Sequence, residues 1–119
     1  PLRAVGFVAV LDLREALPEV DLGVEVLRVR CRDDEPLAVA HVETAIDFIF
    51  EKIRHGSVLV ACGAGLSRSA SVVVGYLVRC GMSPATALAL TRRARPQIAP
   101  SPTTIASVLA VVSALKKAS

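Results

Sequence analysis

The sequence predicts an α/β fold with a central, mostly parallel β-sheet flanked by helices. Short apolar runs typical of strands alternate with longer segments of helical spacing along the 119 residues. A cysteine-to-arginine loop, Cys62–Arg68, lies between one such run and one such segment. Parallel strands joined through helices bind ligands at the carboxyl ends of the strands. The loop is therefore expected at the functional edge of the sheet.

The first half of the chain holds two predicted strands and one predicted helix. The strands cover Phe7–Leu13 and Val24–Val29. The helix is expected from Pro36 to about His55, because proline suits a first helical turn and Gly56 follows the end. Apolar residues recur along it at helical spacing and are expected to face the sheet: Val39, Val42, Ile46, Ile49 and Ile53.

The second half holds the third predicted strand and three predicted helices. The strand is Val58–Ala61, and the helix Ser69–Cys80 that follows is apolar nearly all round, as in a buried helix. Gly81 separates it from a helix of about Pro84–Arg95. Prolines then break the chain before a final helix of about Thr103–Leu115.

The loop Cys62–Arg68 has the composition of an anion site. It joins a strand to a helix start, where backbone N–H groups point inward and the helix dipole favours negative charge. Gly63 and Gly65 permit a close approach of the backbone to the anion. Converging amides of this kind can surround a tetrahedral oxyanion.

Cys62 and Arg68 supply the chemistry that a bare phosphate site lacks. A cysteine beneath converging amides, close to a guanidinium and a helix N-terminus, is expected as the nucleophilic thiolate. Arg68 can bind two phosphoryl oxygens with paired charge-assisted hydrogen bonds. The alternative is an inert buried cysteine beside a glycine turn. The preceding strand, the cysteine-to-arginine spacing and the polar Ser67 and Ser69 favour the catalytic interpretation.

The loop and its flanks resemble the signature of the cysteine-dependent protein tyrosine phosphatases, in the dual-specificity branch and in a compact, prokaryotic or archaeal-like form. The matching stretch is SVLVACGAGLSRSASVVVGY, beginning at Ser57. The resemblance covers most of the chain, since Gly6–Leu13 and Val24–Arg32 are similar to family strands, and Ala45–Ile49 to the helix before the signature. Ile98–Ser101 is similar to a loop that closes on the active site.

This resemblance implies one catalytic domain over residues 1–119 with a dual-specificity phosphatase-like sheet. The implied reaction is hydrolysis of phosphotyrosine and phosphoserine or phosphothreonine in proteins through a cysteinyl-phosphate, without metal or cofactor. Cys62, Arg68, Asp33 and Ser69 are the implied catalytic residues, Ser69 stabilising the departing thiolate. The implied phosphate-binding residues are Gly63, Ala64, Gly65, Leu66, Ser67 and Arg68.

The leaving oxygen needs a proton from a carboxylic acid near the loop. Asp33 and Asp34 follow the second strand, where the resembling family keeps its general acid. Counting from the strand favours Asp33, although both alternatives remain open and one aspartate can simply cap the following helix. Asp12 and Asp47 are expected to be ordinary surface or turn residues.

Three positions depart from the family's pattern. Ala61 stands where most relatives have a histidine that helps to acidify the nucleophile, so a less acidic thiol is expected. Ser101 stands where an asparagine often braces the loop. The start at Pro1 lies almost directly at the second of the family's usual elements, so either the domain is minimal or the chain is trimmed.

Composition favours a compact cytoplasmic enzyme. Hydrophobic residues make up 53% of the chain, yet no apolar run approaches the ~20 residues of a membrane span, and Pro1–Val10 has no signal-peptide pattern. Three cysteines form no disulfide framework and favour a reducing compartment. His41 and His55 lie too far apart, without clustered partners, to predict a metal site.

The basic residues leave two further functions open. Arg28, Arg30 and Arg32 alternate along the second predicted strand and its end. We interpret them mainly as solvated arginines; the alternative is a basic rim for phosphoinositide or RNA 5′-phosphate substrates. Nucleic acid is not expected, because no aromatic platform accompanies the charges. A catalytically silent phosphate-binding module is the other alternative, and the oligomeric state stays open.

Overall fold

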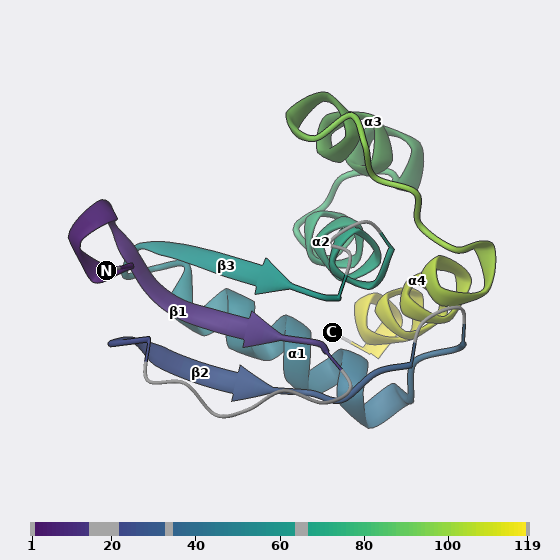
Figure 1. Ribbon diagram of the computed structural model, residues 1–119. Coiled ribbons are helices and arrows are strands. Elements are labelled where there is room, and N and C mark those ends of the chain that lie inside the picture. The colour runs from purple at the N-terminus through teal and green to yellow at the C-terminus, as the bar shows by residue number, and fades with distance from the viewer. Residues whose placement is uncertain (1, 15–21, 33–34, 64–66, 119) are drawn as a thin grey trace.

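The computed structural model describes residues 2–14, 22–32, 35–63 and 67–118. Within them lies a three-stranded parallel sheet in the order β2–β1–β3. The central strand is β1 (Phe7–Asp12), flanked by β2 (Glu25–Arg28) and β3 (Ser57–Ala61), and a short 3₁₀ helix, Arg3–Val5, precedes β1. All three strand arrows in Figure 1 point the same way. The α/β class with a parallel sheet is confirmed.

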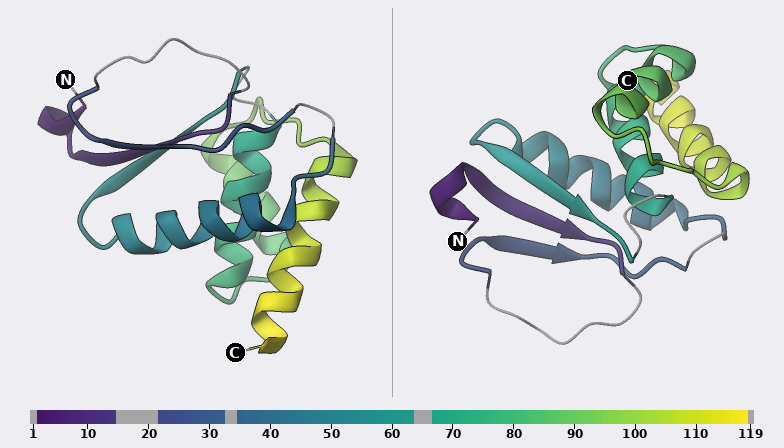
Figure 2. Two further views of the ribbon diagram at one scale, coloured as in Figure 1. Left: turned by 90° about the horizontal axis from the view of Figure 1, so that it is seen from below. Right: turned by 45° about the horizontal axis from the view of Figure 1, so that its top comes forward.

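Four α-helices are described: α1 (Val39–Lys52), α2 (Arg68–Arg79), α3 (Pro84–Ala94) and α4 (Pro102–Ala118). Figure 2 shows α1 lying along one face of the sheet, with the other three helices grouped beside it. Helix α2 packs against α1, α3 and α4, so it is the central helix of the group. This position explains its nearly uniform apolar sequence. None of the described helices has the length and apolarity that crossing a membrane requires.

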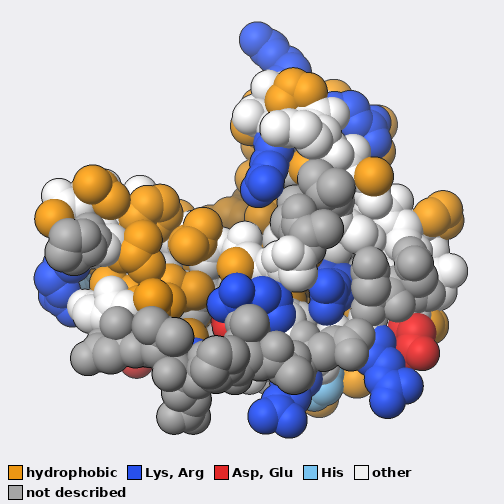
Figure 3. Space-filling model, in the orientation of Figure 1, with side chains coloured by type: hydrophobic (Ala, Val, Ile, Leu, Met, Phe, Trp, Pro, Cys, Tyr) orange, Lys and Arg blue, Asp and Glu red, His pale blue; other side chains and the backbone are white. Residues whose placement is uncertain are grey.

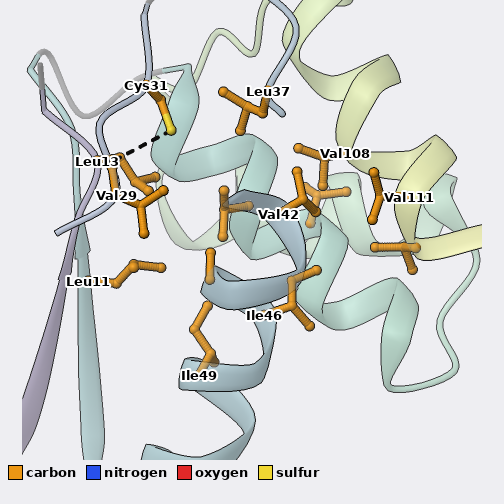
Figure 4. Close-up of a cluster of buried hydrophobic side chains, with 14 of the residues drawn as sticks. Leu11, Leu13, Val29, Cys31, Leu37, Val42, Ile46, Ile49, Val108 and Val111 are labelled. Atoms are coloured by element: carbon orange, nitrogen blue, oxygen red, sulfur yellow. Dashed lines mark hydrogen bonds between the residues drawn. The ribbon is translucent and has the colours of Figure 1, made fainter. Parts of the chain in front are cut away.

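The hydrophobic core lies between the sheet, α1, α2 and α4 (Figure 4). Leu11 and Leu13 of the β1 region point into it from the sheet. The helices contribute fully or almost fully buried side chains: Val42, Ile46 and Ile49 from α1, Val72 and Val74 from α2, and Val108 and Val112 from α4. Leucine and β-branched residues fill this core, whereas the aromatic Phe48, Phe50 and Tyr76 are only partly buried at its border.

Helix α1 begins at Val39 and not at the predicted Pro36. The segment before it is held against α4 instead: the Leu37 N–H donates to Ser107 Oγ at 2.9 Å, and Thr104 Oγ1 donates to the Glu35 carbonyl at 3.1 Å. These long-range bonds replace the first turn of the predicted helix. Two predicted core positions are also wrong, since Val39 is 59% and Ile53 42% exposed.

Candidate active site

Cys62 follows directly after β3, and Arg68 begins α2. Both side chains are buried, each 7% exposed. Because β1, β2 and β3 are parallel, their carboxyl ends meet at the same edge of the sheet as Cys62. The predicted phosphate-binding residues Ala64, Gly65 and Leu66 lie outside the described residues, so their roles stay predictions.

The sulfur of Cys62 faces the first turn of α2. The Ser69 N–H donates to Cys62 Sγ at 3.4 Å, and Ser69 Oγ lies 3.3 Å from the same sulfur. Ser69 is 5% exposed, so these contacts are shielded from water. An amide and a hydroxyl that can both donate to the sulfur stabilise a thiolate, as does the positive end of the helix dipole.

Arg68 is held across the ends of two strands. Its Nη1 donates to the Cys31 carbonyl at 2.7 Å and to the Leu13 carbonyl at 3.4 Å. Its Nη2 lies beside the loop, because a Cβ added at Gly63 would come within 2.9 Å of that nitrogen. The guanidinium is thus fixed at one end by carbonyl oxygens while its other terminal nitrogen lies beside Gly63, the residue after Cys62, an orientation suited to binding an oxyanion.

Ser67 connects the loop to two neighbouring segments. Its Oγ accepts the Ser101 N–H at 2.9 Å, and its carbonyl accepts the Ser71 hydroxyl at 2.8 Å. The segment ending at Ser101 therefore closes against the loop, as the resemblance implies. The bond uses the backbone of Ser101, so a serine side chain in place of asparagine does not remove it.

The carbonyls of Leu13 and Cys31 are site groups that sequence reasoning missed. Backbone carbonyls leave no signal in residue type, so only the fold reveals them. Cys31 is itself buried, its Sγ 3.5 Å from the Val29 carbonyl. Burial raises the pKa of the Cys31 thiol, against the opposing charge of Arg68. Cys31 therefore remains a protonated thiol beside the site.

Asp12 is not the ordinary surface or turn residue that was expected. It is 3% exposed, and its two oxygens lie 2.9 Å from Arg14 Nε and 2.9 Å from Arg28 Nη1. Burial alone would raise the pKa of Asp12, but the hydrogen bonds of Arg14 and the charges of Arg14 and Arg28 outweigh it and hold that pKa below the usual 3.8. The strand register, which places Asp12 beside Arg28, causes this pairing.

The predicted arginine row of the second strand is only partly present. Strand β2 ends at Arg28, and Arg30 and Arg32 lie beyond it. Arg32 is 75% exposed and 4.0 Å from Glu35. Among contacts between described residues, Arg28 alone of the three pairs with a buried side chain, Asp12, so the three arginines do not act as one strand face.

The two candidates for the general acid, Asp33 and Asp34, lie outside the described residues. The segment that leads to them is held beside Arg68, because the carbonyl of Cys31 accepts a hydrogen bond from the guanidinium. The choice of Asp33 over Asp34 stays a prediction. In the described part of the chain, no three His, Cys, Asp or Glu side chains converge as metal ligands would.

Comparisons with known proteins agree with this geometry. The family model described as dual specificity phosphatase, catalytic domain, matches residues 1–113. Over 91 residues the chain is 41% identical to dual specificity protein phosphatase 1 of Arabidopsis thaliana, covering 75% of this chain and 45% of that protein. It is 35% identical over 86 residues to human dual specificity protein phosphatase 26, covering 65% and 41%. The chain thus spans less than half of these curated relatives.

Solved structures show the same fold. The crystal structure of human DUSP28 has a TM-score of 0.87 and 30% identity, covering 99% of this chain and 85% of that one. The structure of Tk-PTP in the active form has a TM-score of 0.77 and 31% identity, with coverages of 97% and 82%. A cysteine and an arginine closing a loop between strand and helix, in a chain matched almost end to end, place this protein in the dual specificity phosphatase family.

Proposed function

We propose that residues 1–119 form one catalytic domain that hydrolyses phosphotyrosine and phosphoserine or phosphothreonine in proteins. The observation that carries the proposal is the buried Cys62 sulfur within reach of the amide and hydroxyl of Ser69, next to a guanidinium anchored on two carbonyls. Family membership supports the same reaction. No disulfide joins any two of Cys31, Cys62 and Cys80, all of which lie in the described part of the chain, and this suits a reducing cytoplasm.

The first step transfers the phosphoryl group to Cys62. The thiolate attacks phosphorus in line, so the Sγ–P bond forms while the ester P–O bond breaks. Arg68 and the loop amides stabilise the charge on the equatorial oxygens as the transition state develops. Asp33, in its protonated form, gives its proton to the departing oxygen.

The second step returns the enzyme to its starting state. Asp33, now ionised, takes a proton from water as the water oxygen attacks phosphorus, and the P–Sγ bond breaks. The electron pair of that bond goes to sulfur, and the hydroxyl of Ser69 stabilises the thiolate at the observed 3.3 Å. Phosphate leaves, and Asp33 has regained from water the proton that it gave to the departing oxygen in the first step.

Alanine at position 61 is compatible with this chemistry. The Ala61 carbonyl accepts the Leu13 N–H at 2.8 Å, so the backbone directly after β1 fixes the point at which Cys62 leaves the sheet. The missing histidine side chain is not needed for that placement. The amide and hydroxyl of Ser69 still lie against the Cys62 sulfur and can stabilise its thiolate, which favours an active enzyme over a silent phosphate-binding module.

Hydrolysis of p-nitrophenyl phosphate and of phosphopeptides, measured against pH, tests the proposal. We expect Cys62→Ser to lose more than about a thousandfold in rate, because the nucleophile is removed. Asp33→Asn should lower the rate about a hundredfold, because the leaving oxygen loses its proton donor. It should also flatten the limb of the pH–rate profile that reports this proton transfer. Asp34→Asn should have little effect.

Cys80→Ser is the matched control, since Cys80 is an exposed thiol at the opposite end of α2. A wild-type protein that binds oxyanions but turns over no substrate at any pH would contradict the enzyme and leave a binding module. A larger loss in Asp34→Asn than in Asp33→Asn would exchange the roles of the two aspartates.

A further inference from the structure

Two arginines share one buried carboxylate beside the candidate active site. Arg14 Nε lies 2.9 Å from Asp12 Oδ1, and Arg28 Nη1 lies 2.9 Å from Asp12 Oδ2. Asp12 is 3% exposed, whereas the Arg14 and Arg28 side chains are 38% and 31% exposed. One carboxylate cancels one of the two positive charges, so this Arg14–Arg28 pair keeps a net positive charge at the surface.

The pair lies at the same edge of the sheet as the catalytic loop. Asp12 is in register with Arg28 on one side and with Ala61, the residue before Cys62, on the other. Two strand spacings separate Arg28 from Ala61, or about 10 Å between backbones. Figure 3 shows Lys and Arg side chains gathered over the carboxyl end of β1, with an acidic side chain partly hidden beneath them.

The shared carboxylate preorganises the pair. A free arginine side chain loses much conformational entropy when it binds a ligand. Here Arg14 is held by both Nε and Nη2, and Arg28 by Nη1, so much of that entropy is already lost in the unbound protein. Each guanidinium has further N–H donors, and their planar geometry suits a carboxylate or phosphate.

We propose that the Arg14–Arg28 pair is a second anion subsite, which selects phosphopeptides carrying another phosphate or an acidic side chain about three residues from the phosphate that is hydrolysed. An extended peptide advances about 3.3–3.6 Å per residue, so about three residues cover the roughly 10 Å between the backbones at Ala61 and Arg28. This inference rests on the proposed function, because it adds a specificity determinant to the same site.

A peptide fits this edge better than RNA does. Single-stranded nucleic acid needs aromatic side chains on which bases stack. The chain has four aromatic residues: Phe7 at the start of β1, Phe48 and Phe50 on α1, and Tyr76 on α2. None of these positions is at the carboxyl edge of the sheet. The edge offers charge and hydrogen-bond donors, which a peptide carboxylate or phosphate can use.

The test compares phosphotyrosine peptides that differ at a single residue. That residue lies three places before or three places after the phosphotyrosine and is alanine, glutamate or phosphoserine. For the wild type we expect kcat/KM about tenfold higher with the better-placed anion than with alanine. Arg14→Met and Arg28→Met should each remove most of this ratio. Arg54→Met is the matched control, because Arg54 is an exposed arginine at the opposite end of the sheet, and it should keep the ratio.

Equal kcat/KM for all peptides in the wild type, or a ratio unchanged in both Arg14→Met and Arg28→Met, would overturn the subsite. Calorimetry with Cys62→Ser measures the ratio of affinities for the anionic and the alanine peptides, and so separates the subsite from the proposed function. A preference for binding the anionic peptide, together with a wild type that turns over no substrate, would contradict the function and retain the subsite. High salt should lower the wild-type ratio of kcat/KM between the anionic and the alanine peptides, because salt screens the charges. This measurement uses the wild type alone, so it does not depend on whether a variant folds. A phosphoinositide preferred over every peptide, with the same arginine dependence, would replace the peptide by a lipid headgroup.

Discussion

The carboxyl of Asp12, at the end of β1, makes the stability of the folded protein depend on pH. Its pKa lies below the usual 3.8 because the bonds and charges of Arg14 and Arg28 outweigh the effect of burial. A carboxyl whose pKa is lower in the folded state stabilises the fold above its unfolded pKa, and this contribution is lost as the pH falls through the folded value. The Asp12 contribution is therefore fully present at neutral pH, begins to fall below about pH 4 and is lost as the pH passes below the lowered pKa of the folded state.

We predict that Asp12→Asn lowers the free energy of unfolding by roughly 2 kcal/mol at neutral pH, because it leaves partly exposed arginines without their buried carboxylate. Below about pH 4 the difference from the wild type should shrink progressively, since the wild-type carboxyl becomes protonated as the pH falls through its lowered pKa. Urea unfolding across the acidic range measures both quantities. Asp47→Asn, on the exposed side of α1, is the control and should change stability by less than ~0.5 kcal/mol. A difference that does not depend on pH would contradict the ion-pair origin of the effect.

The contrast between Asp12 and Cys62 shows what residue types can and cannot reveal. Cys62 and Arg68 could be assigned from the sequence, because a thiol and a guanidinium at that spacing, between a strand and a helix, indicate one kind of anion chemistry. Asp12 could not, because an aspartate after an apolar strand usually begins a turn, and only the register with β2 shows that Arg28 is beside it. The carbonyls that hold Arg68 are invisible in sequence for a stronger reason: every residue has one.

At the scale of elements, α2 and α4 approach closely at Gly75. A Cβ added there would clash with Val108 Cγ1, and Val108 is fully buried. Alanine gains about 1 kcal/mol in helix propensity over glycine, but overpacking a filled core costs about 1–3 kcal/mol. We predict that Gly75→Ala destabilises the protein by about 1–2 kcal/mol, because the clash outweighs the propensity.

A double-mutant cycle with Val108→Ala checks that prediction. Val108→Ala alone opens a cavity and should also destabilise. The double variant should be clearly more stable than the sum of the two single effects implies, because the new methyl group fills the space vacated by valine. Additive effects in chemical denaturation would mean that the two helices do not meet as closely as the structure places them.

Element types could be predicted well, and element boundaries less well. Short apolar runs, helical spacing and the glycines and prolines between them predicted the three described strands and four described helices, because such patterns reflect burial and chain breaks. The start of α1 was wrong because Pro36 is a good first-turn residue locally, whereas the Leu37–Ser107 and Glu35–Thr104 bonds reach across about 70 residues of chain. A local pattern cannot contain a competing contact of that range.

At the scale of the whole molecule, the candidate site joins segments that are far apart in the sequence. Arg68 contacts the carbonyls of Leu13 and Cys31, and Ser67 accepts from Ser101. The loop itself could be predicted because its residues are consecutive, and its place at the sheet edge followed from parallel topology. The partners of the loop required the complete fold. An oxyanion that binds there consequently stabilises β1, the chain after β2, α2 and the segment before α4 together.

This arrangement predicts that oxyanion binding stabilises the entire domain. Tungstate at about a hundredfold excess over its dissociation constant should add about 2.7 kcal/mol and raise Tm by on the order of 10 °C, because it binds only the folded chain. Arg68→Met should abolish the shift, Cys62→Ser should retain part of it, and Arg92→Met, an exposed arginine of α3, should retain all of it. Scanning calorimetry with chloride at equal ionic strength removes general salt effects. An undiminished shift in Arg68→Met would place the oxyanion elsewhere, since Arg68 is the residue through which the strand ends and the loop are joined.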